Sequence, residues 1–235
     1  MGRPPRAAPG LPARLREISR LLARRFGRPE VCGHQTAPVQ NLVLTILSQN
    51  TTDANRDRAY DALMKRFPTL PALAAAMPAE VEEAIRVGGL AKAKTRSILG
   101  ALSRLKEEHG GYSLDFLRST PLAEARAYLT SFPGVGVKTA NILLLFSFGL
   151  PAFPVDTHIL RVTKRLGLVP GNATLGKAAA TLEPHVPKEA HGPLHLNLIR
   201  LGREVCRPRT PLCPACPLLR VCPEGARRTG GNPAP

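Results

Sequence analysis

Four cysteines in the last part of the chain have a spacing that suits one compact inorganic site. Six, two and five residues separate Cys206, Cys213, Cys216 and Cys222 in turn. Thiolates are soft ligands that select iron–sulfur clusters or zinc. Zinc ribbons usually bring two short pairs of cysteines, whereas only Cys213 and Cys216 make such a pair here. The longer gaps let the thiolates spread around a cube, so the spacing favours a 4Fe–4S cluster over zinc.

Disulfide pairing is the remaining alternative for these cysteines, and the context disfavours it. Nothing in the sequence resembles a secretory signal, and the chain is too long to need stapling. The fifth cysteine, Cys32, lies outside the spacing beside a polar run, and we interpret it as structural or incidental.

The charge of the chain indicates a polyanionic partner. Among 235 residues, 33 are Lys or Arg and 17 are Asp or Glu, which gives a formal net charge of +16. A protein this basic most often binds nucleic acid. Some of the excess lies in the tails that we predict over 1–10 and 225–235, but removing Arg3, Arg6, Arg227 and Arg228 only lowers +16 by four to +12.

No feature of the sequence points to a membrane. No apolar run approaches the roughly 18 residues that a membrane-spanning helix needs. The first ten residues lack the apolar core of a targeting peptide. We therefore expect a cytoplasmic protein, associated with the nucleoid if it is bacterial, and no membrane partner.

Apolar residues recur with the period of a helix through most of the chain, and no convincing strand pattern appears. This predicts an all-α fold. Asp53 is the expected N-cap of a helix that contains Ala59 and Phe67, and Thr120 with Pro121 is a start signal for another. The helices predicted from this period span 39–47, 53–67, 78–87, 95–108, 121–131, 138–148, 158–166 and 193–206.

Two glycine-containing hairpins join predicted helices. One spans 132–138 and reads Phe-Pro-Gly-Val-Gly-Val-Lys, and the other spans 87–92. The first ends at a helix N-terminus, where free N–H groups and the helix dipole attract phosphate. An ordinary turn between helices is the alternative. Together with the net charge, the glycines and lysine favour phosphate binding.

Three motifs taken together resemble one known family. They span 132–140, 153–161 and the cysteine loop 206–222, and weaker agreement occurs at 47–53 and 88–94. Over roughly residues 15–222 the chain resembles endonuclease III, within the helix-hairpin-helix superfamily of base-excision DNA glycosylases.

The resemblance implies two helical domains that flank a DNA-binding cleft. One is a six-helix barrel over 31–150 that ends in the hairpin, and the other is a cluster domain formed by 11–30 and 151–224. It also implies a 4Fe–4S cluster on the four cysteines. The implied partner is double-stranded DNA with a damaged pyrimidine or an abasic site, bound by a monomer.

The implied reaction needs one amine and one carboxylate, and the resemblance supplies Lys138 and Asp156. A neutral amine that attacks C1′ forms a Schiff base and permits β-elimination. A free lysine, with a pKa of about 10.4, is mostly charged, so the positive helix end and burial must help to neutralise it. The carboxylate stabilises positive charge on the sugar. The alternatives are a phosphate-binding lysine and a structural helix cap.

Further residues are implied to contact DNA. Asn50 and Leu90 correspond to positions that fill the gap left by a flipped base, although relatives usually carry glutamine at the first. The alternative for Leu90 is a residue that packs inward against its turn. Lys92, Lys94 and Arg96 suit phosphates, and so do Gly134, Val135 and Gly136 of the hairpin.

The cluster is expected to fold the loop 207–221 and to present Arg207, Arg209 and Arg220 to the DNA backbone. We predict that His195 is a packed or hydrogen-bonded histidine. His158, two residues from Asp156, is a candidate for supporting that carboxylate.

Two rival functions remain. Adenine and mismatch glycosylases of the superfamily usually lack the hairpin lysine, which is present here as Lys138. A DNA-binding or redox-sensing module without catalysis is the second rival. The presence of both Lys138 and Asp156 argues against it.

Overall fold

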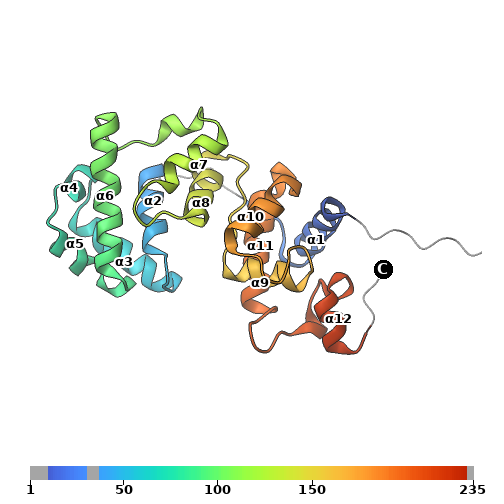
Figure 1. Ribbon diagram of the computed structural model, residues 1–235. Helices are drawn as coiled ribbons and strands as arrows, with labels where there is room; N and C mark the ends of the chain where they lie inside the picture. Colours follow the sequence, from blue (N-terminus) through green and yellow to red (C-terminus); the bar gives the residue numbers. More distant parts are fainter. Residues whose placement is uncertain (1–9, 31–36, 232–235) are drawn as a thin grey trace, which may run out of the picture. The chain divides into compact units, whose positions relative to one another are not determined.

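The computed structural model describes residues 10–30 and 37–231 (Figure 1). These described residues form α-helices and 3-10 helices and no β-strand, which confirms the all-α prediction. The chain divides into two compact units. Unit 1 combines Met1–Val31 with Pro151–Pro235, and unit 2 is Cys32–Leu150. Cys32 itself and the predicted tail up to residue 9 lie outside the described residues.

Residues 37–150 of unit 2, which the structure describes, form six α-helices of seven residues or more and one of five. Its helix α2 packs against α6 and α8, and α5 also packs against α6. The six-helix barrel expected for this unit stays a prediction. The helices are α2 (Pro38–Leu47), α3 (Asp53–Arg66), α4 (Leu70–Ala74), α5 (Pro78–Ala84), α6 (Ala91–His109), α7 (Leu122–Thr130) and α8 (Val137–Phe148), with 3-10 turns η1 (Arg86–Gly88) and η2 (Asp115–Arg118).

The longest of these helices is α6, with 19 residues. Its buried face includes Ile98, Leu102 and Leu105, which are four and three residues apart and therefore share one side of a helix. It ends at Gly110, whose φ of 69° places it in the left-handed region that favours glycine. Lys94, Thr95 and Ser97 of its first two turns are buried as well, so the start of α6 is also held within unit 2.

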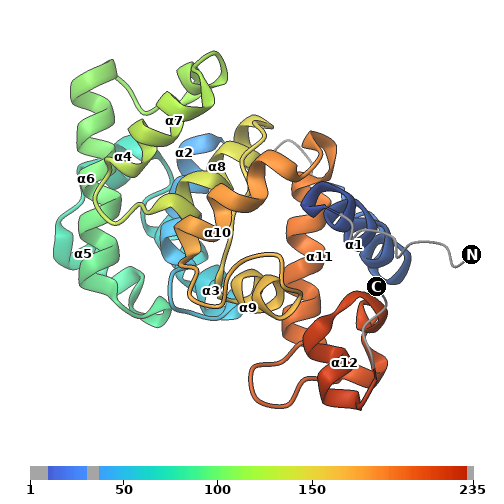
Figure 2. The same ribbon diagram turned by 45° about the vertical axis from the view of Figure 1, so that its right-hand side comes forward.

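Unit 1 is built around α1 (Leu11–Phe26) and α11 (His191–Glu204), which lie side by side in Figures 1 and 2. Apolar residues three or four apart on each helix form the core between them: Leu15, Ile18 and Leu22 on α1, and Leu194, Leu198 and Leu201 on α11. Residues from distant parts of the sequence therefore form one core. The other helices are α9 (Thr157–Arg165), α10 (Leu175–Leu182) and α12 (Pro223–Thr229), with 3-10 turns η3 (Glu183–His185), η4 (Lys188–Ala190), η5 (Cys213–Ala215) and η6 (Leu219–Val221).

Within the described part of the chain, no helix is both long enough and apolar enough to cross a membrane.

Two of the predicted capping signals lie one residue away from the N-cap that the structure shows. The hydroxyl of Thr52, not Asp53, caps α3 by accepting a hydrogen bond from the N–H of Asn55 at 3.2 Å. Asp53 is instead the first residue of the helix and pairs with Arg56. The helix start predicted at Pro121 is one residue too early, because Pro121 keeps an extended ψ of 139° as the N-cap and α7 begins at Leu122.

Other boundaries differ more. The helix predicted over 78–87 leaves the α-helical conformation at Ile85 and continues as η1. Helix α6 starts at Ala91, four residues earlier than predicted. Residues 225–229, which were expected to belong to a tail, lie in α12, where Glu224 forms ion pairs with Arg227 and Arg228.

The hairpin between α7 and α8 is fitted closely onto α6. Gly134 has a φ of +74°, and a Cβ atom there would lie 2.2 Å from Oγ of Ser97 on α6. The N–H of Val135 donates to the carbonyl of Phe132 at 3.1 Å, and both side chains are buried. Two constraints therefore favour glycine at position 134: the positive φ of the backbone and the short distance to Ser97.

We predict that Gly134→Ala lowers the free energy of unfolding by about 1–3 kcal/mol, because alanine is strained at positive φ and collides with Ser97. Urea unfolding followed by circular dichroism measures this. Gly136→Ala is the matched control, since Gly136 has a φ of −88° and open space around its Cβ position. Its effect should stay below about 1 kcal/mol. Equal losses in the two variants would contradict the packing described for Gly134.

Candidate functional site

Lys138 lies in the first turn of α8, directly after the hairpin. Gly136 occupies the N-cap position and Val137 is the first residue of the helix. The Lys138 side chain is half-buried. The unpaired N–H groups of a helix start carry partial positive charge, which disfavours a second positive charge nearby. The start of α8 therefore contributes positive potential close to this amine.

Asp156 is the N-cap of α9, as predicted. Its Oδ1 accepts a hydrogen bond from the N–H of Ile159 at 2.7 Å, which fixes the orientation of the half-buried carboxylate. Ile159 and Val162 bury the apolar side of α9, and this helix packs against α11. Asp156 belongs to unit 1 and Lys138 to unit 2. The pairing of the two residues in one reaction stays a prediction.

Asn50 and Leu90 sit at the tips of two loops in unit 2. They are the two non-glycine residues with positive φ in the described ranges, at 51° and 50°. Both are exposed, and 59% of Leu90 is accessible. The alternative in which Leu90 packs inward is therefore wrong. The two loops border a common groove, lined by Asn50, Thr51, Thr52 and Asn55 on one side and by Val87, Gly88 and Gly89 on the other.

Lys94 does not lie where the sequence pattern placed it. Lys92 and Arg96 are exposed, as phosphate contacts require, but Lys94 is only 2% exposed. Its Nζ donates hydrogen bonds to the carbonyls of Leu47 at 2.7 Å and Gly88 at 2.9 Å. Burial lowers the pKa of the Lys94 ammonium. The predicted phosphate contact of Lys94 is wrong, because protein atoms enclose this cation.

Two further residues near these loops were missed by sequence reasoning. Nε2 of Gln49 donates to the carbonyl of Gly134 at 3.0 Å, so it links the Asn50 loop to the hairpin. Val137, the first residue of α8, is 41% exposed. In the sequence, the signal that could have identified them is that Gln49 precedes Asn50 and Val137 precedes Lys138. In contrast, the predicted DNA contact Val135 is 4% exposed and can offer DNA no side chain.

The four cysteines line one pocket in unit 1. Cys206, Cys213, Cys216 and Cys222 share its wall with apolar side chains that include Val205, Leu212 and Leu219. Three of the cysteines, Cys206, Cys216 and Cys222, also pack against the core of the unit. A common pocket is what the spacing predicted. Donors of a single soft type suit iron–sulfur or zinc chemistry.

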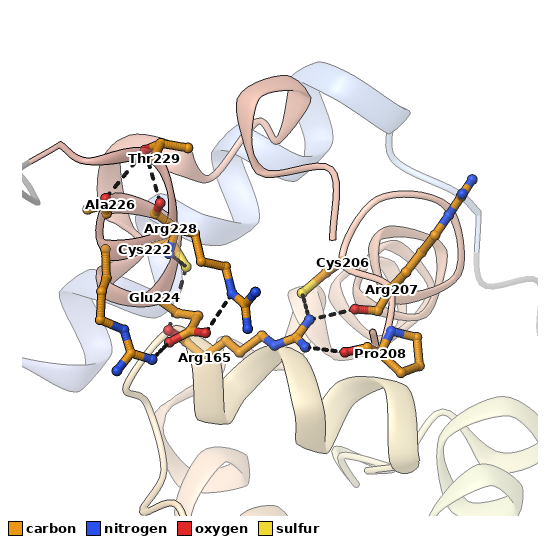
Figure 3. Close-up of polar contacts among 11 residues, drawn as sticks. Arg165, Cys206, Arg207, Pro208, Cys222, Glu224, Ala226, Arg228 and Thr229 are labelled. Atoms are coloured by element: carbon orange, nitrogen blue, oxygen red, sulfur yellow. Dashed lines mark hydrogen bonds and ion pairs between the residues drawn. The ribbon is translucent and has the colours of Figure 1, made fainter. Parts of the chain in front are cut away.

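Arginines of α9 attach the cysteine loop to the unit. Nη1 of Arg165 lies 3.3 Å from Sγ of Cys206 and donates to the carbonyl of Arg207 at 2.7 Å, and Nη2 donates to the carbonyl of Pro208 at 2.7 Å (Figure 3). Arg161 donates from Nε to the carbonyl of Cys206 at 3.0 Å. The first cysteine is therefore held by two guanidinium groups from one helix.

The pocket disfavours bare thiolates. Burial, together with the neighbouring thiols of Cys222, Cys206 and Cys213, raises the pKa of the Cys216 thiol to about 11. Burial also raises the pKa of Cys222. A bound cation would therefore stabilise the thiolates of Cys216 and Cys222. Among residues 10–30 and 37–231, no group of three or more His, Cys, Asp or Glu side chains converges as ligands of a single ion would.

The remaining predicted residues are two histidines and three arginines, all in unit 1. His195 is buried, and its Nδ1 lies 2.9 Å from the carbonyl of Pro154, which confirms a packed, hydrogen-bonded histidine. Nδ1 of His158 lies 3.2 Å from Nη2 of Arg161. The support of His158 for Asp156 stays a prediction. Arg207, Arg209 and Arg220 of the cysteine loop are exposed.

Several known proteins resemble this chain in sequence and in fold. Endonuclease III of Thermotoga maritima is 34% identical over 93% of this chain and 96% of its own length. Endonuclease III of Bacillus subtilis is 34% identical over 81% of this chain and 83% of its own. A solved non-covalent endonuclease III–DNA complex has a TM-score of 0.80 and 32% identity, and covers 93% of this chain and 98% of that one. The family described as HhH-GPD superfamily base excision DNA repair protein matches residues 43–188. The chain therefore belongs to the HhH-GPD superfamily of base excision DNA repair proteins.

Proposed function

We propose that this protein is a bifunctional DNA glycosylase and abasic-site lyase that removes oxidised pyrimidines from duplex DNA. The observation that carries the proposal is Lys138, a half-buried amine in the first turn of α8, directly after the glycine hairpin. A solved relative with a TM-score of 0.79 is a trapped endonuclease III–DNA covalent intermediate, which supports covalent chemistry here. Such DNA would be met in the cytoplasm, on the nucleoid of a bacterium.

Lys138 acts as the nucleophile. Its neutral amine attacks C1′ of the damaged nucleotide, the C1′–N bond breaks, and the base leaves with its electron pair and takes up a proton. Ring opening then gives a Schiff base between Nζ and C1′. The Schiff base makes the 2′ proton acidic, so its removal expels the 3′ phosphate by β-elimination. Water finally hydrolyses the Schiff base and restores the amine.

Asp156 stabilises the positive charge that develops on the sugar as the base leaves. The hydrogen bond from the N–H of Ile159 holds its carboxylate in one orientation, so little reorganisation is needed during the reaction. Once the base has gone, this charge no longer forms. Asp156 therefore matters more for base excision than for cleavage of an abasic site.

The loops and the hairpin of unit 2 hold the DNA. Exposed Asn50 and Leu90 enter the duplex where the damaged base leaves the stack. Gly134 and Gly136 are exposed and bring the hairpin backbone close to a phosphate, and Lys92 contacts a neighbouring phosphate. Asn50 is shorter than glutamine, so its contact with the opposite strand reaches less far.

Cys206, Cys213, Cys216 and Cys222 would hold a 4Fe–4S cluster through their thiolates. The pocket that the four cysteines share supports this. When bound, the cluster supplies positive charge that keeps the thiolates ionised. The loop folded around it presents Arg207, Arg209 and Arg220 to the DNA backbone.

Borohydride should trap the wild-type protein covalently on lesion-containing duplex, because it reduces the Schiff base. Lys138→Gln should abolish trapping and strand cleavage while DNA binding remains, and gel electrophoresis measures both. Asp156→Asn is the control. It should block excision of the damaged base but still allow trapping on a preformed abasic site. A Lys138→Gln protein that still forms the adduct would place the nucleophile elsewhere.

The purified protein should be brown, with broad absorbance near about 400 nm from thiolate-to-iron charge transfer. Cys213→Ser should lose the colour, since one iron loses its protein ligand. Cys32→Ser, which lies outside the four-cysteine spacing, should keep it. A colourless wild-type protein that contains stoichiometric zinc would contradict the cluster assignment.

A further inference from the structure

The tips of the two loops that border the groove of unit 2 are both strained. Asn50 and Leu90 adopt the left-handed conformation, with φ of 51° and 50°. This conformation is costly for a side chain such as leucine and persists only where the surroundings enforce it. Both side chains are exposed, so they make few contacts that could do so. Contacts of the backbone on either side of each tip must therefore hold the left-handed conformation in place.

Lys94 supplies that contact for both loops at once. Its ammonium donates to the carbonyl of Leu47, the last residue of α2, three residues before Asn50. It also donates to the carbonyl of Gly88, the last residue of η1, two residues before Leu90. Carbonyls at a helix end lack partners within the helix and carry partial negative charge. One buried cation therefore joins the ends of two elements.

The fit around this cation is close. A Cβ atom at Gly88 would lie 3.2 Å from Cβ of Ala59 and 3.8 Å from Nζ of Lys94. Burial of an ammonium is unfavourable, and it lowers the pKa of Lys94. Removing the amine would leave two inward-facing carbonyls without their donor. An apolar side chain could fill the space, but it could not hold both loops.

We propose that Lys94 is a positioning residue that fixes the Asn50 and Leu90 loops relative to each other, so that their tips enter the duplex together. This inference rests on the proposed function. Without the amine, each loop would still fold on its own helix, but the spacing of the tips would vary. Opening the duplex at a paired lesion needs both tips, whereas a preformed abasic site lacks a base to unstack.

Lys94→Met tests this, because methionine keeps the length and apolar stem of lysine but removes the donors. Single-turnover excision of an oxidised pyrimidine should fall by about 10- to 100-fold, as expected for misplaced groups. Fluorescence of a 2-aminopurine beside the lesion should rise less on binding than with the wild type. Trapping on a preformed abasic site and affinity for undamaged duplex should stay within about threefold. A general loss of folding would lower all four measurements together.

Lys106→Met is the matched control, since Lys106 is an exposed lysine on the same helix that donates to the carbonyl of Gly110. It should leave all four measurements unchanged. If Lys94→Met does not fold, Lys94→Gln, which can still donate to one carbonyl, is tested in the same way. Excision at the wild-type rate by a folded Lys94 variant overturns the inference. Absence of excision and trapping in the wild type would instead overturn the proposed function.

Discussion

The buried ammonium of Lys94 is the interaction that links the two loops at the groove of unit 2. It joins the end of α2 to the end of η1 through the carbonyls of Leu47 and Gly88. One turn further along α6, Ser97 lies against Gly134 of the hairpin. Gln49 connects the Asn50 loop to the hairpin by donating a hydrogen bond to the carbonyl of Gly134. The first two turns of α6 thus hold three separate loops, each of which carries residues proposed to contact DNA.

In unit 1, helix α9 plays a part similar to that of α6 in unit 2, because it holds several proposed functional residues. Asp156 caps its first turn, and Arg161 and Arg165 on the following turns bind the segment that contains Cys206. The proposed carboxylate and the proposed cluster are therefore attached to one short helix, which packs against α11. Because burial disfavours the thiolates of Cys216 and Cys222, cluster binding and the order of this loop should be linked.

Sequence reasoning succeeded where the signal was local. The cap at Asp156, the glycine hairpin and the common pocket of the cysteines each follow from residues close together in the chain. It failed at Lys94, because a lysine near a helix start looks like a phosphate contact. Its burial depends on the carbonyl of Leu47, which is 47 residues away. The exchange of Asp53 for Thr52 as the cap was a choice between adjacent good capping residues, which sequence alone does not decide.

The central claim is that the amine of Lys138 forms the covalent link to DNA. Mass spectrometry of peptides from the borohydride-trapped wild-type complex tests it most directly, because the reduced sugar remains on the amine that attacked. The account predicts a single modified peptide that contains Lys138, with the added mass on that side chain. Modification of Lys92, Lys94 or the terminal amine in place of Lys138 would contradict it.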